Sequence, residues 1–412
     1  MSSAVIAFKS ETCRPRVLAG LRLLWVAAVT LLLAACSTGG MDMGSLFSDN
    51  SGRGAPAPGG IPQASPSGAK VALLLPLGAS GEPARIATAM KQAAEQALID
   101  AGNAGVTLIT KDTGGNAQGA QMAAEAAIAE GAELILGPLL ANEVQAVAPA
   151  ARERGVPVIA FSSVSATATP GVYLMSFLPE EEVANLVRHA TTTGIRSYGA
   201  LIPKSQYGSI AERALMVAAK NYGSAVPVVE RYARTPDGVA DPTKKLVEAM
   251  NGGEKVQALV VPEGGSMLGT VASALAQSGF APGGVKLMGT GLWDDPVTSR
   301  TALIAGGWYA GVAPDLVAQF DQKYKASYGS VPPRIASLAY DAVSLAVAMG
   351  RSPPGQRFTA QQITNPEGYQ GVNGLFRFRP NGLIERGLSI LEVTPNGPKV
   401  IAPPPARFSL GY

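Results

Sequence analysis

Residues 70–110 read KVALLLPLGASGEPARIATAMKQAAEQALIDAGNAGVTLIT, and this stretch decides the fold class. Val71–Leu75 is an uninterrupted apolar run, which is typical of a short strand in a parallel sheet. Arg85–Ala101 places its apolar residues on one helical face and stops before Gly102, as an amphipathic helix does. Val106–Thr110 follows as a second strand. A strand, a helix and a strand in this order indicate a parallel sheet.

The same alternation continues along the chain and then restarts. Short apolar strands alternate with alanine-rich helices as far as Phe177, and a second series runs from a helix at Pro179–Thr193 to a strand at Lys286–Gly289. Two further helices are expected at Pro314–Tyr328 and Ile335–Met349. The chain is therefore predicted to be an α/β protein with two lobes, each built on a doubly wound parallel sheet.

The end of the chain has a different pattern. In Leu375–Arg379, apolar and polar residues alternate, with Phe376 and Phe378 on one face. The turn-forming sequence Pro380–Gly382 follows, so we expect 375–379 and 383–393 to form an antiparallel hairpin.

Composition and charge exclude several classes of protein. The 412 residues are 47% hydrophobic and 15% charged, which excludes a disordered chain. One His and two Cys leave little for a zinc cluster or a Ser-His-Asp relay, so we expect no catalytic residue, metal or cofactor. Residues 1–35 hold four of the 33 basic and one of the 30 acidic residues. The remainder is formally neutral and gives no reason to expect nucleic-acid binding.

The first 69 residues indicate a targeting segment and a tether. A basic stretch precedes the apolar run Leu23–Ala35, which is too short to span a bilayer comfortably. The sequence Leu33–Cys36 resembles a bacterial lipobox, which implies a lipidated Cys36, and Ser37 resembles an outer-membrane sorting signal. An ordinary secretory signal or a short membrane anchor with an incidental Cys is the alternative. Gly, Ser and Pro occupy 18 of the 33 positions in 37–69, which is typical of a flexible tether.

Candidate ligand-binding residues follow the expected strands, because open α/β sheets bind ligands at the carboxyl ends of their strands. The candidates are Leu139, Ser162, Ser163 and Ser165 in lobe one, and Tyr207, Glu263, Trp293 and Asp294 in lobe two. Serine hydroxyls and backbone N–H groups can hold a carboxylate, and an acidic side chain can meet an ammonium, so these residues fit an amino-acid-like ligand. Alternatively, Asp294 caps a helix, the serines form a polar turn and Trp293 is a packing residue.

Two charged groups in the helix Pro179–Thr193 have structural explanations. His189 lies near its carboxyl end, where a cation favours the helix dipole, so capping is expected rather than catalysis. Glu180–Glu182 begins the same helix, where acids favour the dipole, so a solvated first turn is expected rather than a metal site.

Four segments carry a family resemblance: Val71–Leu77, Asp112–Thr113, Leu136–Leu139 and Val156–Ile159. They resemble the type I periplasmic-binding fold over about residues 70–395. The resemblance implies two parallel-sheet lobes joined at a hinge by three crossovers. The expected parts are a signal peptide over 1–35, a lipidated Cys and tether over 36–69, lobe one over 70–177 and 306–356, lobe two over 178–305 and 357–395, and a tail over 396–412.

Within that superfamily, Leu75–Leu77, Gly137–Leu140 and Phe177–Glu182 most resemble penicillin-binding protein activator lipoproteins. This resemblance implies a non-enzymatic lipoprotein at the periplasmic face of the outer membrane whose partner is a peptidoglycan synthase. The pattern departs from some members, which carry a helical-repeat domain before this fold.

A second resemblance is to branched-chain amino-acid binding proteins of transporters. Ser163, Ser165 and Tyr207-Gly208 match cleft residues of that family. Glu263 stands where that family often has an aromatic residue, and Asp294 lies near its ammonium-binding acid without an exact motif. This resemblance implies a substrate-binding protein of an ABC transporter. A glycosidase using paired carboxylates is a third hypothesis, although no suitable pair stands out.

Overall fold

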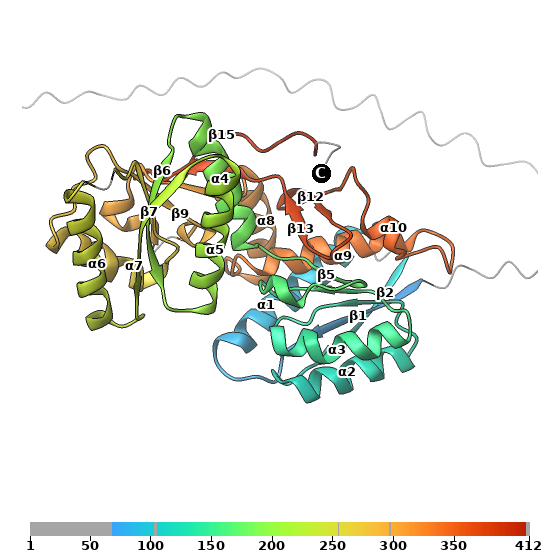
Figure 1. Cartoon of the computed structure of the whole chain (residues 1–412). Coiled ribbons are helices and arrows are strands. Elements are labelled where there is room, and N and C mark those ends of the chain that lie inside the picture. The colour runs from blue at the N-terminus through green and yellow to red at the C-terminus, as the bar shows by residue number, and fades with distance from the viewer. Residues whose placement is uncertain (1–67, 103–104, 254, 296–297, 409–412) are drawn as a thin grey trace, which may run out of the picture. The chain divides into compact units, whose positions relative to one another are not determined.

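The computed structural model of the chain describes residues 68–102, 105–253, 255–295 and 298–408 (Figure 1). The expected signal peptide, Cys36 and nearly all of the tether lie outside the described residues. Within the described ranges, no helix combines the length and the apolar character needed to cross a membrane.

Lobe one contains a five-stranded parallel sheet in the described chain, with the strand order β2-β1-β3-β4-β5. Its first elements are β1 (Ala69–Leu75), α1 (Glu82–Asp100), β2 (Val106–Asp112), α2 (Ala117–Ala129), β3 (Leu134–Leu136), α3 (Ala141–Glu153), β4 (Val158–Ala160) and β5 (Val172–Leu174). The run Val71–Leu75 is fully buried. It pairs with β2 on one side and β3 on the other, so the strand, helix and strand predicted from residues 70–110 are confirmed.

Lobe two contains a seven-stranded sheet in the described chain, with the order β15-β14-β10-β9-β8-β6-β7. Its elements are α4 (Pro179–Thr192), β6 (Ser197–Pro203), α5 (Gln206–Asn221), β7 (Ala225–Tyr232), α6 (Pro236–Asn251), β8 (Ala258–Val260), α7 (Gly265–Gln277), β9 (Lys286–Gly289), β10 (Trp308–Gly311), β14 (Ser389–Glu392) and β15 (Lys399–Ala402). Strands β6 to β10 are parallel, whereas β14 and β15 are antiparallel to their neighbours. The predicted doubly wound α/β class is confirmed.

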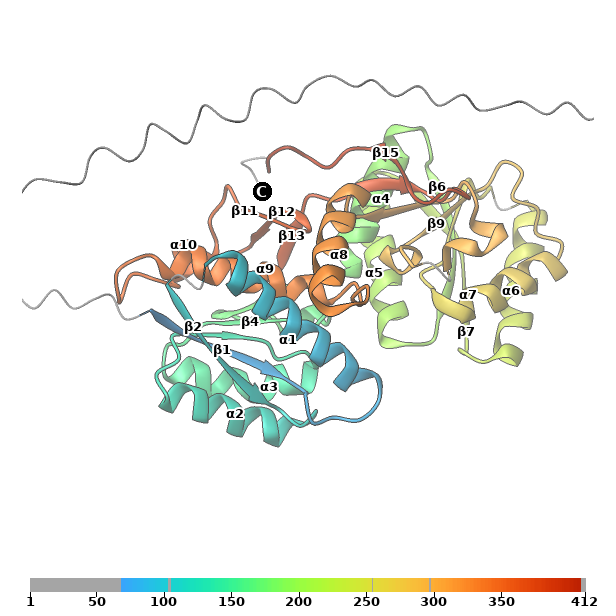
Figure 2. The ribbon, with the colours of Figure 1, turned by 180° about the vertical axis from the view of Figure 1, so that it is seen from behind.

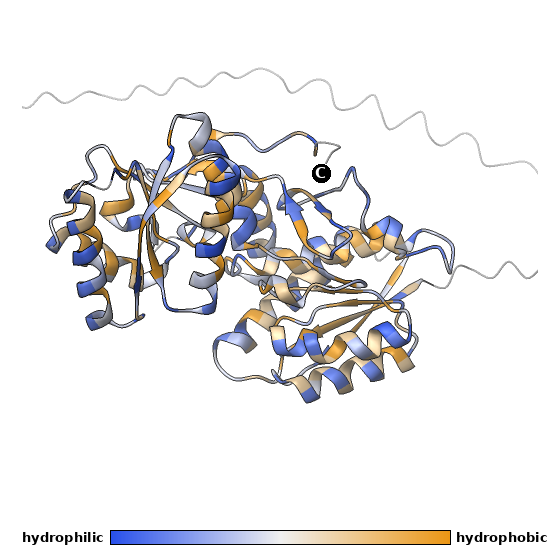
Figure 3. Cartoon of the chain, viewed as in Figure 1, coloured by the Kyte–Doolittle hydropathy of each residue, from blue (hydrophilic) through white to orange (hydrophobic). Residues whose placement is uncertain are grey.

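Each face of the lobe-two sheet has its own apolar core. Residues of α4 and α5 pack on one face, and residues of α6 and α7 pack on the other. Figure 3 shows hydrophobic residues in the strands and hydrophilic residues on the outer sides of the helices. Helix α6 begins six residues earlier than Pro242, the start expected from the sequence, because the Thr235 hydroxyl caps it and Pro236 suits its first turn.

The late part of the chain packs mainly on lobe one. It comprises α8 (Pro314–Tyr328), α9 (Ala336–Gly350), α10 (Ala360–Ile363), β11 (Tyr369–Gly371), β12 (Gly374–Phe378) and β13 (Ile384–Arg386). Helix α9 is apolar on nearly all sides and is accordingly buried, lying against α1 (Figure 2). Phe376 and Phe378 share the buried face of β12, as predicted.

The predicted hairpin is confirmed in its first half only. Strands β12 and β13 pair antiparallel, with Phe378 opposite Ile384. The continuation of the second arm does not pair with β12: β14 leaves for lobe two and pairs with β10. Burial explains the split, because Phe376, Phe378 and Ile384 belong to the lobe-one core, whereas Ile390 and Leu391 belong to lobe two.

The lobe boundaries therefore differ from those expected. Strand β10, expected at the start of the 306–356 return to lobe one, belongs to the lobe-two sheet. Most of 357–395, expected in lobe two, packs on lobe one, whereas residues 388–393 around β14 pack in lobe two. The expected tail over 396–412 contributes β15 to the lobe-two sheet.

Three connections pass between the lobes in the described chain, at 175–178, 312–313 and 387–388. The described residues of both lobes belong to one compact unit. The crossovers implied by the resemblance are thus present, although the third leaves from the small sheet of β11 to β13.

Candidate functional site

The lobe-one candidates lie together at the carboxyl ends of β3 and β4. These two strands are neighbours, and the Phe161 N–H donates to the Pro138 carbonyl at 2.9 Å just beyond them. Leu139 is half-buried and packs against the lobe-one core. The position at the sheet edge is the one that the strand pattern predicts.

The three serines differ in exposure and in what they contact. Ser162 is buried, and its hydroxyl accepts a hydrogen bond from the Val164 N–H at 3.2 Å. Ser163 is exposed, and Ser165 is half-buried at the start of a short 3-10 turn. The Ser162 contact is that of a polar turn. Of the three serines, Ser163 has the side chain that is most open to solvent.

Glu263 is held entirely by residues of lobe two. Its carboxylate accepts hydrogen bonds from the Tyr232 hydroxyl at 2.8 Å and from Arg234 Nε and Nη2 at 3.0 and 3.1 Å. The Glu263 side chain is 3% exposed, whereas Arg234 is 51% exposed. A bidentate arginine and a phenol leave this carboxylate well neutralised inside its own lobe.

Trp293 is a packing residue in the structure. It lies in the short turn η2 (Gly291–Trp293), is fully buried, and its indole N–H donates to the Glu263 carbonyl at 3.1 Å. Its ring occupies the space where a Cβ on Gly289 or Gly307 would lie, within 2.1 and 2.7 Å of ring atoms. The two glycines therefore make room for the indole, and the alternative interpretation of Trp293 as a packing residue matches its position.

Asp294 follows Trp293 and contacts both lobes. The Tyr309 hydroxyl donates to its Oδ1 at 3.2 Å, and Arg334 Nε lies 3.7 Å from its Oδ2. Burial raises the pKa of Asp294, and the nearby Arg334 opposes that shift. A cavity of about 510 Å³ lies beside this pair, lined also by Tyr309, Pro333 and Val393.

Tyr207 lies near Glu182, an acid that is buried although the sequence pattern predicts it to be exposed to solvent. Its hydroxyl donates to Thr290 Oγ1 at 2.8 Å. Glu182, expected in a solvated first turn, is 6% exposed, and its Oε2 accepts the Gly291 N–H at 3.0 Å. Burial raises the pKa of Glu182 to about 7, and burial beside Glu182 raises the pKa of Tyr207 well above its ordinary value.

The approach of Glu182 to its partner depends on a glycine. A Cβ at position 291 would lie 2.5 Å from Glu182 Oε1, so a side chain there would displace the carboxylate. Glu182 is thus fixed against η2, and the expectation of a solvated turn is wrong for this residue.

A second group of polar residues was not predicted. We call Phe177, Arg334, Asp341, Asn373 and Arg386 the hinge cluster. Arg334 Nη1 donates to Asn373 Oδ1 at 2.7 Å, and Asn373 Nδ2 donates to Asp341 Oδ2 at 2.7 Å. Both guanidinium groups lie close to the Phe177 ring, that of Arg334 at 4.7 Å and that of Arg386 at 4.9 Å from the ring centre.

The hinge cluster is unusually buried for its charge. Asp341 and Arg386 are 1% and 3% exposed. Burial raises the pKa of Asp341 and lowers that of Arg386 to about 10, and the attraction between them opposes both shifts. One sequence signal was available, because Asp341 interrupts the otherwise apolar run of α9. Nothing in the local sequence singles out Arg334.

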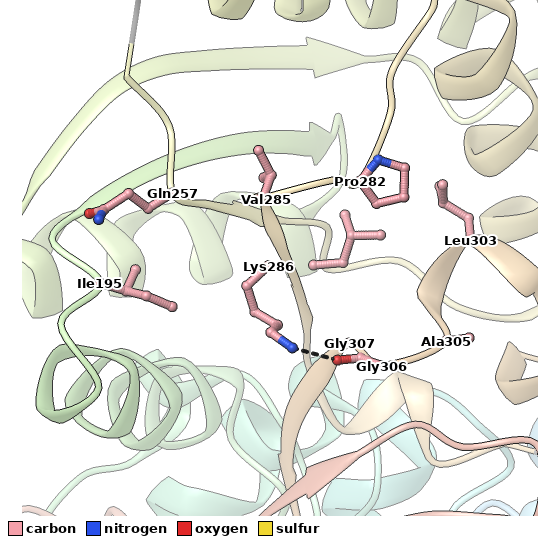
Figure 4. A pocket seen from close by; sticks show the side chains of 11 residues that line it. Ile195, Gln257, Pro282, Val285, Lys286, Leu303, Ala305, Gly306 and Gly307 are labelled. Carbon is pink, nitrogen blue, oxygen red and sulfur yellow. Dashed lines mark hydrogen bonds between the residues drawn. The ribbon is translucent and has the colours of Figure 1, made fainter.

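A further cavity lies at the opposite edge of lobe two (Figure 4). Its volume is about 420 Å³, and it is lined by residues that precede or begin strands, including Ile195, Gln257 and Lys286. Lys286 Nζ donates to the Gly306 carbonyl at 2.9 Å and lies over the Trp308 ring. Since ligands in parallel α/β sheets bind at the carboxyl ends of the strands, this cavity lies at the other end from the candidate site.

His189 lies near the same edge. It is in the last turn of α4, as expected, and its ring is 5.3 Å from that of Trp308. Burial lowers the pKa of His189. Within the described ranges, no group of three or more His, Cys, Asp or Glu side chains is arranged to hold a metal ion.

Two parallel-sheet lobes, three crossovers and polar residues at the carboxyl ends of the strands define a two-lobed binding protein. The family described as "Periplasmic binding protein" matches residues 68–398, and the chain belongs to that family. This membership indicates a periplasmic location. None of the curated proteins compared with the chain matches it.

Solved structures with this fold include transport proteins and a regulator. A putative branched-chain amino acid ABC transporter protein from Rhodospirillum rubrum is 21% identical, with a TM-score of 0.69 over 81% of this chain and 100% of that one. LivJ from Streptococcus pneumoniae in complex with isoleucine is 16% identical, with a TM-score of 0.58 over 83% and 100%. The C-domain of LpoA from Haemophilus influenzae, a regulator of PBP1A, is 20% identical, with a TM-score of 0.60 over 81% and 100%. At these identities the likeness shows the fold.

Proposed function

We propose that this chain is a non-enzymatic lipoprotein of the outer membrane, anchored through Cys36, that binds a peptidoglycan synthase and stimulates it. The observation that carries the proposal is that both candidate acids of lobe two are already paired with arginines of the same chain. Glu263 is paired with Arg234, and Asp294 is paired with Arg334.

This pairing disfavours an amino-acid carrier. A ligand ammonium would have to displace Arg334 from Asp294, or Arg234 and Tyr232 from Glu263, and leave a buried group without its partner. Trp293, which could otherwise cover the apolar part of a ligand, is fully buried in lobe two. The two acids expected to bind a ligand ammonium are therefore already paired with arginines of this chain.

The support for a peptidoglycan synthase as the partner comes from the sequence. Cys36-Ser37 resembles the start of a mature outer-membrane lipoprotein, and Phe177–Glu182 resembles the activator lipoproteins. In the structure the latter segment spans the end of the first crossover and the start of α4, with Phe177 in the hinge cluster and Glu182 buried against η2. A lipid anchor contributes about 0.8 kcal/mol per buried methylene, so a multiply acylated protein stays at its membrane.

The direct test is the rate at which a purified penicillin-binding protein polymerises lipid-linked peptidoglycan precursor. We expect the rate to rise on addition of the full chain, in saturable fashion. An unchanged rate with the synthases of the same cell would contradict the proposal. In cell fractionation, Cys36→Ser should move the protein from the outer membrane to the soluble periplasm, whereas Cys13→Ser should leave it in place.

A second candidate function is the binding of amino acids for an ABC transporter. The observation in its favour is the cavity of about 510 Å³ beside Asp294, which is within the usual size range of small-molecule sites. Calorimetric titration with amino acids and with muropeptides separates the two functions, because only the carrier should bind leucine-like ligands with micromolar affinity.

A further inference from the structure

Arg334 contacts residues of both lobes and of the connection between them. It lies two residues before α9, which packs in lobe one, and its Nη1 donates to Asn373 in the turn between β11 and β12. On the other side, its Nε lies 3.7 Å from Asp294, which follows the lobe-two strand β9. Its guanidinium also lies over Phe177, on the first crossover.

The partners of Arg334 are themselves fixed. Asn373 is 1% exposed and donates to Asp341, whose other oxygen accepts the Val372 N–H at 2.7 Å. Asp294 is held by the Tyr309 hydroxyl from β10. A side chain that joins two immobilised groups restricts their relative motion, whereas one that joins two flexible groups does not.

The environment strengthens the attraction between Arg334 and Asp294. Their side chains are 27% and 22% exposed, so water screens them less than it screens a surface pair. Asp321 in α8, Asp341 in α9 and Glu182 in α4 add to the negative charge near Arg334, and Arg386 lies near the Phe177 ring. Arg334 is thus attracted by acids of both lobes: it pairs with Asp294 of lobe two while its Nη1 stays bonded to Asn373 of lobe one.

We propose that Arg334 is an internal latch: by bonding Asn373 on lobe one and pairing with Asp294 on lobe two, it holds the two lobes in one arrangement. The inference goes beyond the proposed function, and its test involves no synthase. In a chain without the latch, the lobes sample additional arrangements about the three crossovers.

The test is the distance between spin labels on the two lobes, measured by double electron–electron resonance on the full chain. Met122 in α2 and Met216 in α5 are 62% and 46% exposed and serve as labelling sites after replacement by Cys, with Cys13 and Cys36 replaced by Ser. The test variants are Arg334→Gln and Asp294→Asn. The matched control is Arg234→Gln, which breaks the pair with Glu263 within lobe two.

We expect Arg334→Gln and Asp294→Asn to broaden the distance distribution and shift it to longer values, while Arg234→Gln leaves it unchanged. Salt at 1 M should broaden the distribution of the chain with Arg334 and Asp294 intact, because it screens a partly exposed ion pair. Unchanged distributions in both test variants would overturn the proposal. A shift in Arg334→Gln without one in Asp294→Asn would also overturn it, since the ion pair would then not be the closing contact. If Arg334→Gln does not fold, the distance distribution of Asp294→Asn alone tests the proposal.

Discussion

Two arginine–carboxylate pairs involve candidate acids of lobe two, Glu263 and Asp294, but the pairs differ in what they join. Arg234 and Glu263 form a short bidentate pair within the lobe, and Arg234 is half exposed. Arg334 and Asp294 form a longer pair, 3.7 Å apart, between residues that belong to different lobes. The first pair stabilises a loop that is already ordered by its lobe, whereas the second constrains a hinge.

These two pairs show that an acid expected to bind a ligand can instead stabilise its own lobe or join the two lobes. An acid at the carboxyl end of a strand can serve a ligand, its own lobe or the other lobe, and the partner decides which. Here Glu263 is paired within its own lobe, and Asp294 is paired with Arg334 at the junction between the two lobes. The proposed recognition of a protein partner rests on that distinction.

The largest expected effect concerns Asp341, which fixes the lobe-one side of the junction. Asp341→Ala removes the acid whose charge most favours the buried Arg386 guanidinium, and it leaves the Asn373 side-chain amide and the Val372 N–H without their acceptor. A donor left unsatisfied costs about 1–3 kcal/mol of unfolding free energy, so we expect a loss of about 2–6 kcal/mol, measured by urea denaturation. Asp241→Ala, on the exposed side of α6, is the control and should stay within about 0.5 kcal/mol. Equal losses in the two variants would contradict the role given to Asp341.

A pH series tests Glu182, which lies beside the junction. Its pKa is about 7 in the folded chain against 4.5 as the ordinary value, so the folded chain binds more protons than the unfolded chain between these pH values. The unfolding free energy should therefore fall as pH rises from 4.5 to 7, by up to about 3 kcal/mol from this group.

Glu182→Gln removes that contribution to the pH dependence. Urea denaturation across pH 4.5–7.5 should give a smaller slope for Glu182→Gln than for the unmodified chain. Glu212→Gln, which alters the pair with the half-exposed Arg231, is the control and should keep the full slope. Parallel curves for Glu182→Gln and the unmodified chain would show that Glu182 does not titrate in this range.

Within lobe two, the expected effect of losing an acid is smaller. Glu263→Ala leaves the buried Tyr232 hydroxyl without its acceptor, which costs about 1–3 kcal/mol. Tyr232→Phe in the Glu263→Ala background should recover part of the loss, because the unsatisfied hydroxyl is then gone. A double variant no more stable than Glu263→Ala would argue against this hydrogen bond as the source of the loss.

The smallest effect is expected for the exposed arginine of the same pair. Arg234→Ala should cost about 1 kcal/mol or less, because its side chain is 51% exposed and solvent screens the interaction. Thermal unfolding at low and high salt gives the measurement, and the difference from the unmodified chain should shrink at high salt. A loss above about 2 kcal/mol would remove the contrast between the two pairs.

The sequence predicted the sheets well and the junction poorly. Uninterrupted strands such as Val71–Leu75 and amphipathic helices such as α1 are determined by local periodicity, so their positions follow from nearby residues. The lobe assignment of β10 and of β11 to β13 depends on which core buries Tyr309, Phe376 or Phe378, which is a tertiary property.

The candidate functional site could also be predicted only in part from the sequence. The position of Ser162, Ser163 and Leu139 at one sheet edge follows from the strand pattern, and so does that of Asp294 at the end of β9. The pairing of Asp294 with Arg334 does not, because 40 positions separate them and Arg334 belongs to no motif. The burial of Glu182 depends on Gly291, more than 100 positions away.

Calorimetric titration of L-leucine and L-isoleucine into the full chain tests the central claim most directly. Because Arg334 and Arg234 already neutralise the two candidate acids, we expect no saturable heat for either amino acid up to millimolar concentration. Saturable binding with a micromolar Kd, equivalent to about 8 kcal/mol, would contradict the claim and favour a carrier of amino acids.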